Sequence, residues 1–248
     1  MGNDFHAIDY LLALHDQFGS YPNGVIRISR RIPGTAFFPG GSGLWNTQPD
    51  KPLPLMPVDG VMIVGHNFDS EAGFERSFNY AEKNLKGPTW RNLLAFLKQV
   101  EILPEWCFFT NAYVGLQSGD RAIGPFPGER DHEFVCWCQN FLLEQIKLMQ
   151  PRLILSLGAY VPSFLASLSS ELRRVWSGVR RLTMLDEREV ASVYPSTFVG
   201  VLRPTAVVAL THPAYRHVNV KHRRYRNLEG EAAEQAMVKD ALARQELG

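Results

Sequence analysis

Length, composition and charge are typical of an ordinary globular protein. The 248 residues are 45% hydrophobic and 21% charged, which is enough to bury the core of one large α/β domain or of two small ones. The formal net charge of +1 excludes a uniformly basic or acidic chain, so a charged binding site has to be sought in local clusters. Three cysteines are too few for a disulfide framework and predict a reducing, cytoplasmic location.

The first sixty residues predict one helix and a long loop. The N-terminal stretch MGNDFHAIDYLLALHDQF carries acids early and has no apolar run near the ~18 residues that a membrane span needs, so no targeting or spanning segment is expected. Apolar residues at helical spacing over 5–15 predict an opening helix. The Gly- and Pro-rich stretch 19–60 predicts a long surface loop, either a plain connection or one that lines a ligand cleft.

Apolar strands alternate with helices along the rest of the chain. The predicted strands are GVMIVG, WCFFTN, PRLILSLG and TAVVALTH, and the predicted helices cover 89–100, 131–149, 159–176 and 229–245. This alternation is typical of a three-layer α/β/α sandwich with a central, mainly parallel, four-stranded sheet. We expect a single domain over 1–248, with the N-terminal helix and loops in 1–57, the α/β core in 58–228 and a C-terminal helix in 229–248.

Polar side chains follow the strands at the edge where parallel sheets bind ligands. His66, Asn67 and Asp69 come directly after the first strand, the second strand ends in Asn111, and the last strand leads to His212. Two amides and an imidazole at one edge suit a reaction whose leaving group is a planar, hydrogen-bonding anion.

A basic tract follows the last strand in VVALTHPAYRHVNVKHRRYR. Its cations after the His-Pro pair are Arg216, Lys221, Arg223, Arg224 and Arg226, with no acid before Glu229. A core strand needs no such tract, so the pattern indicates an anionic partner, and a merely solvated charged face is the alternative.

Taken together, these residues resemble the uracil-DNA glycosylase superfamily. Gly65-His66-Asn67 is similar to the Gly-x-Asn first motif of the mismatch-specific and single-strand-selective branches, TNAY to the second motif, and THPAY to the His-Pro-Ser third motif. The resemblance spans 60–215, with the three motifs in order at successive strand ends. Phe68 replaces the Pro of the first motif and Ala214 the Ser of the third, while the tyrosine that excludes 5-methylated bases and the iron–sulfur cysteines have no counterpart.

The resemblance implies a monofunctional DNA glycosylase that flips a pyrimidine out of the DNA stack and needs neither cofactor nor metal. In that role Asn67 would orient the hydrolytic water and His212 would donate a hydrogen bond to the pyrimidine O2. Base binding would fall to Phe78 as the stacking ring, to Asn111 and to His66 and Asp69. Tyr215 would fill the vacated space, and the phosphates would be held by Arg216, Lys221, Arg223 and Arg224.

Each of these residues also has a structural interpretation. Asn67 suits a helix cap, Asn111 a backbone bridge, His212 a satisfied structural imidazole and Phe78 a core position. The missing Pro-Tyr pair favours a bulky 5-substituted pyrimidine as the substrate, such as glucosylated hydroxymethylcytosine in phage DNA, and a role in anti-phage defence. The alternatives are a housekeeping uracil or mismatch glycosylase and a catalytically silent nucleic-acid-binding module of the same fold.

Overall fold

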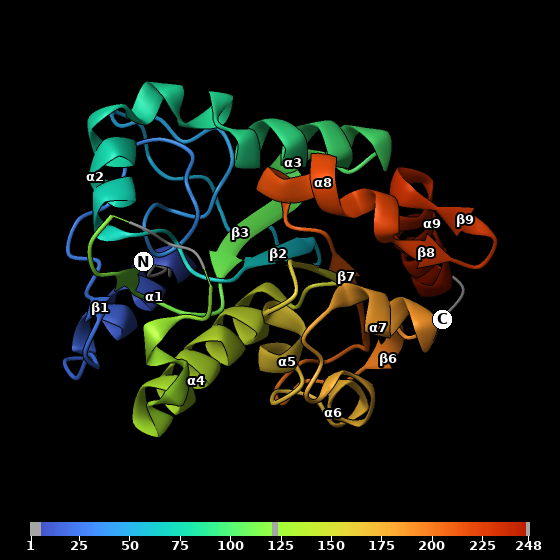
Figure 1. Ribbon diagram of the computed structural model, residues 1–248. Helices are drawn as coiled ribbons and strands as arrows, with labels where there is room; N and C mark the ends of the chain where they lie inside the picture. The colour runs from blue at the N-terminus through green and yellow to red at the C-terminus, as the bar shows by residue number, and fades with distance from the viewer. Residues whose placement is uncertain (1–5, 121–123, 247–248) are drawn as a thin grey trace.

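A five-stranded sheet lies between two layers of helices in the computed structural model, which describes residues 6–120 and 124–246 (Figure 1). The strand order is β3-β2-β5-β7-β6, where β2, β3, β5 and β7 run parallel and β6 pairs antiparallel with β7. The strands are β2 (Val61–Gly65), β3 (Cys107–Asn111), β5 (Leu153–Leu157), β6 (Ser192–Ser196) and β7 (Thr205–Leu210). The predicted three-layer α/β/α sandwich is therefore confirmed.

The four parallel strands form where the sequence predicted them, because each is a short run of apolar residues that is buried along its whole length. Strand β6 was missed by the sequence analysis, and the sheet has five strands rather than four. Its sequence SVYPS is only partly buried and contains Pro195, which lacks a main-chain donor. Such a proline is tolerated because β6 is an edge strand.

Two of the longer helices begin with favourable residues. Pro88 occupies the first turn of α3 (Pro88–Gln99), and the Asp131 carboxylate accepts a hydrogen bond of 2.9 Å from the Phe134 N–H at the start of α4 (His132–Met149). The other helices are α1 (Ala7–Gln17), α2 (Glu71–Asn79), α5 (Val161–Leu165), α6 (Ser170–Trp176), α7 (Leu182–Glu187), α8 (Arg216–Asn219) and α9 (Gly230–Glu246). Among the described residues, no helix combines the length and the apolar character needed to cross a bilayer.

Short elements fill the connections between these helices and the sheet. They are the 3-10 helices η1 (Ala81–Lys86), η2 (Pro104–Trp106), η3 (Pro127–Arg130), η4 (Pro213–Tyr215) and η5 (Val220–His222), and the strand pairs β1 (Val25–Ile26) with β4 (Leu116–Gln117) and β8 (Arg224–Tyr225) with β9 (Leu228–Glu229). The opening helix starts at Ala7, and Phe5, which the sequence analysis included in it, lies outside the described residues.

The two helical layers are made of different parts of the chain. Helices α3 and α9 lie on one side of the sheet, where the Gln235 amide donates a hydrogen bond of 3.2 Å to the Gln99 side-chain oxygen (Figure 1). Helix α4 covers the other side, with α1 packed against it. Although α9 reads as polar in the sequence, it buries a stripe of residues at helical spacing: Ala233, Glu234, Met237, Val238 and Ala241.

The Gly- and Pro-rich stretch 19–60 is not a surface loop throughout, contrary to the sequence expectation. Phe38 is fully buried, with its ring 5.8 Å from the rings of both Phe108 and Phe141. Its N–H donates to the Phe109 carbonyl at 2.9 Å, and the Phe109 N–H donates to the Gly43 carbonyl at 2.8 Å. The part of the stretch around 36–44 is buried because it supplies main-chain partners to β3, which is otherwise an open sheet edge.

Candidate active site

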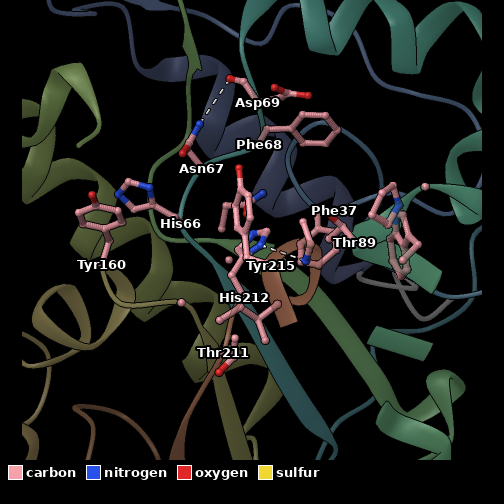
Figure 2. A pocket seen from close by; sticks show the side chains of 18 of the residues that line it. Phe37, His66, Asn67, Phe68, Asp69, Thr89, Tyr160, Thr211, His212 and Tyr215 are labelled. Atoms are coloured by element: carbon pink, nitrogen blue, oxygen red, sulfur yellow. Dashed lines mark hydrogen bonds between the residues drawn. The ribbon is translucent and has the colours of Figure 1, made fainter. Parts of the chain in front are cut away.

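A cleft of about 1220 Å³ opens at the carboxyl ends of the parallel strands. The residues that follow β2, β3, β5 and β7 all contribute to its lining, and Ala36 and Phe37 reach it from the N-terminal stretch. The alternative in which that stretch lines a ligand cleft is thus the one that the structure adopts. Figure 2 shows His66, Asn67 and Asp69 from the segment after β2, and His212 from the turn after β7, around this cavity.

Asn67 is held by the residues that follow it in the chain. Its amide NH2 donates a hydrogen bond of 3.4 Å to the Asp69 carbonyl, leaving its oxygen as an acceptor (Figure 2). The Asp69 carboxylate accepts the Ser70 N–H at 2.6 Å, and Ser70 caps α2 by accepting the Gly73 N–H at 3.1 Å. The first motif is therefore fixed by the start of α2, and the Asn67 oxygen, with two lone pairs, has capacity to bind water.

His66 is a neutral imidazole packed against an aromatic ring. It stacks on Tyr160, with ring centroids 4.8 Å apart and planes 22° apart. Burial lowers the pKa of His66 to about 4; the nearby His212 lowers it further, whereas a hydrogen bond with the Asn67 side chain acts in the opposite direction. The lowered pKa keeps the His66 ring neutral near pH 7.

Asn111 enters the cleft because Gly65 is opposite it in the parallel register. A side chain at Gly65 would meet the Asn111 side-chain oxygen, so glycine is required for this close approach. The Asn111 amide is almost fully buried and donates a hydrogen bond of 3.4 Å to the Phe38 carbonyl. One amide proton and the oxygen remain to pair with a planar ligand.

His212 begins the tight turn that follows β7. Its Nδ1 accepts a hydrogen bond of 3.3 Å from the Ala214 N–H, so the proton of the neutral ring is on Nε2. Burial lowers the pKa of His212 below its ordinary value, which keeps the ring neutral near pH 7. Tyr215 is half exposed beside it, with ring centroids 5.6 Å apart (Figure 2).

Phe78 is not at the cleft, where the sequence analysis expected its ring to stack on the base. It is absent from the cleft lining within the described chain and packs instead in a small separate cluster near Phe74. The Arg30 guanidinium lies 4.5 Å above its ring, which further identifies Phe78 as structural. The aromatic rings that do line the cleft include Phe37 and Phe68.

The predicted phosphate-binding role is wrong for two of the arginines. Arg216 and Arg223 are 6% and 1% exposed, and both form internal ion pairs. A guanidinium that is already buried against carboxylates is not available to a phosphate. Lys221 and Arg224 of the same tract are exposed, and Arg224 lies 3.3 Å from the Glu229 carboxylate.

Further cations stand at the cleft that the sequence analysis did not single out. Arg180 and Arg181, in the segment between α6 and α7, are exposed and line the cavity. Their only sequence signal was the pair of adjacent arginines in SGVRRLTM. Among the described residues, no group of three or more His, Cys, Asp or Glu side chains is placed to hold a metal ion.

The fold and the cleft define a class of α/β protein with a cavity beyond the carboxyl ends of its parallel strands, where open sheets of this kind bind ligands. A sequence model described as the uracil DNA glycosylase superfamily matches residues 57–240, and the chain belongs to this superfamily. The resemblance inferred from the three motifs is thereby confirmed. A search of curated proteins found no match. Membership supports a DNA glycosylase-like function, with DNA as the molecule acted on.

The lowered pKa of His66 predicts a loss of stability in acid. The unfolded imidazole takes up a proton near pH 6.5, but the folded one only near pH 4, so the free energy of unfolding falls as the pH drops through this window. Urea denaturation between pH 7 and pH 4 should give a flatter profile for His66→Gln than for the wild type. His217→Gln, a substitution of an exposed histidine, serves as the control. Parallel profiles for the wild type and His66→Gln would contradict the lowered pKa of His66 as the cause.

Proposed function

We propose that the protein is a monofunctional DNA glycosylase that flips a modified pyrimidine into the cleft and hydrolyses its N-glycosidic bond. The observation that supports this most directly is the arrangement of Asn67, Asn111 and His212 around one cavity, each with free hydrogen-bonding capacity. In this reaction the bond between the sugar C1′ and the base N1 breaks, its electron pair leaves with the base, and water adds to C1′. The product is an abasic site.

His212 would stabilise the departing base. Negative charge develops on the pyrimidine O2 as the bond breaks, and the Nε2–H of a neutral imidazole is a donor for it. A donor aimed at a developing oxyanion contributes about 3 kcal/mol. Asn67 would hold the water through its side-chain oxygen, and because an amide is a poor base, the proton of that water passes to solvent.

The size of the cleft supports a bulky substrate. Its volume of about 1220 Å³ exceeds the range of roughly 300–1,000 Å³ that is usual for drug-sized ligands. The Phe68 ring, which replaces the family's Pro in the sequence, packs 5.4 Å from the Phe74 ring and against the main chain at Gly40 while it lines one part of the cleft. The cleft extends to polar side chains of Ser77 and Asn84, which suit a sugar-bearing 5-substituent such as that of glucosylated hydroxymethylcytosine in phage DNA.

Exposed cations at the rim of the cleft would hold the DNA backbone. Arg180 and Arg181 line the cleft on the segment before α7. Lys221 and Arg224 are exposed on the segment after α8, next in sequence to the cleft-lining His222 and Arg223. Tyr215, half exposed at the mouth, would occupy the gap left by the flipped base. Anti-phage defence by excision of a hypermodified base is the role that we propose for this arrangement.

A panel of DNA duplexes tests the substrate. The protein should leave alkali-labile abasic sites faster in DNA with glucosylated hydroxymethylcytosine than in matched DNA with hydroxymethylcytosine, uracil or mismatched thymine, because the wide cleft accepts the sugar. Faster release of uracil would instead identify a housekeeping glycosylase. DNA binding with no abasic product on any duplex would identify a silent binding module.

Variants at the two proposed catalytic residues test the mechanism. His212→Ala and Asn67→Ala should each slow single-turnover base release, by about a hundredfold for the histidine donor, while DNA affinity stays nearly unchanged. His217→Ala, an exposed histidine of the same segment, should keep the wild-type rate. Wild-type rates in both cleft variants would refute the assignment.

Salt titration tests the revised DNA-binding surface. Replacing Arg180, Arg181 or Lys221 by Ala should lower the dependence of DNA affinity on salt by about one unit of slope for each phosphate that the variant no longer neutralises. Arg203→Ala is the matched control, since Arg203 is 82% exposed but precedes β7, at the opposite end of the sheet from the cleft. Unchanged slopes in the three rim variants would mean that these cations are only solvated.

A further inference from the structure

A fully buried carboxylate lies directly behind the His212 turn. Glu234 is on α9, and one of its oxygens accepts the Thr211 N–H at 2.6 Å and the Arg223 guanidinium at 2.6 Å. Its other oxygen accepts a hydrogen bond from Arg216. Glu234 thus bonds to the main chain of the residue that immediately precedes His212.

The two arginines tie this carboxylate to the rest of the fold. Arg223 makes two hydrogen bonds of 2.9 Å to the Asp186 carboxylate on α7 and one of 2.9 Å to the Ala209 carbonyl on β7. Arg216 lies with its guanidinium carbon 4.6 Å above the Phe96 ring on α3. Glu234 and Asp186 supply two buried carboxylates for the two guanidinium groups, so the charges of these four side chains balance, as burial requires. The second terminal nitrogen of Arg216 lies 3.9 Å from the half-exposed carboxylate of Glu231.

A second bond holds the same turn from α3. The Asn92 amide donates a hydrogen bond of 2.8 Å to the Pro213 carbonyl, across 121 residues of sequence. The main chain is therefore fixed at Thr211, before His212, and at Pro213, after it. The Ala214 N–H that fixes the His212 tautomer follows directly in this held segment.

We infer that Glu234 and Asn92 are positioning residues for His212, acting through the main chain on either side of it. This inference rests on the proposed role of His212 as the donor to the base. Neither residue lines the cleft among the described residues, so neither is expected to touch DNA. Their effect is to hold the Ala214 N–H against Nδ1, which keeps the ring proton on Nε2.

The test combines a chemical and a spectroscopic measurement. In Glu234→Gln, one oxygen and an NH2 group replace the two oxygens that accept hydrogen bonds. Asn92→Leu removes the donor to the Pro213 carbonyl and leaves the ion pairs of Glu234 intact. Both variants should release base about tenfold to a hundredfold more slowly with DNA affinity unchanged, as expected for a displaced catalytic group. Nitrogen-15 NMR of the His212 ring should change from the Nε2–H tautomer to a mixture of tautomers.

Matched controls separate positioning from stability. Asp186→Asn disturbs the same buried cluster without removing the Glu234 bond to Thr211. Gln99→Ala removes the hydrogen bond between Gln99 on α3 and Gln235 on α9, which lies away from the His212 turn. Both variants should keep the Nε2–H tautomer of His212 and the wild-type rate of base release, even where the melting temperature falls. Glu234→Asp keeps the negative charge with a shorter reach, and it replaces Glu234→Gln in the comparison if the latter does not fold.

The tautomer decides the inference independently of the proposed activity. A pure Nε2–H tautomer in the folded Glu234 variant or in Asn92→Leu overturns it, as do rates no lower than those of the two controls. If the wild type releases no base from any DNA, the proposed function fails alone, and the ring proton still reports whether the two residues position His212.

Discussion

The common register of the parallel strands is the constraint on which the candidate site depends. Strands β2, β3, β5 and β7 end at one edge of the sheet, and the pairs Gly65 with Asn111 and Leu157 with Leu210 keep these ends level. Side chains alternate between the faces of a strand, so a slip of one residue would turn Asn111 away from the cleft. The site is therefore specified by strand pairing before any of its side chains interacts with a ligand.

The cleft holds neutral polar side chains and exposed cations in different places. Its floor carries amides and the imidazoles of His66 and His212, both with pKa values lowered by burial. Hydrogen bonds are stronger in such a low-dielectric setting than in water. Burying a neutral donor there costs less desolvation free energy than burying a cation. Exposed cations such as Arg180 and Lys221 lie towards solvent, where long-range attraction to an anion does not require their burial.

Much of this arrangement was predictable from the sequence because it is locally encoded. Apolar runs predicted the parallel strands, and the residues directly after them predicted His66, Asn67, Asn111 and His212 at the cleft. The roles of the basic tract were not predictable in this way. Arg223 pairs with acids 37 and 11 residues away, and nothing in a run of cations indicates which of them will meet a carboxylate.

The other differences have the same origin in tertiary packing. Phe78 was assigned to the base because the segment between the first two motifs resembles the family segment that begins with an aromatic residue, but its ring lies beneath Arg30. The Gly- and Pro-rich stretch was expected at the surface, yet an edge strand lacking main-chain partners draws Phe38 into the core. Strand β6 is short and contains a proline, so its pairing depends on β7 being present.

The position of Glu234 in the chain has a consequence for the order in which the site is completed. Helix α9 follows every strand of the sheet, so a growing chain can pair its strands before it has a carboxylate to neutralise Arg216 and complete the pairing of Arg223. Until then two guanidinium groups keep their water, and the His212 turn lacks its inner anchor. The turn that carries His212 therefore gains its bond to Glu234 only when α9 packs against the sheet.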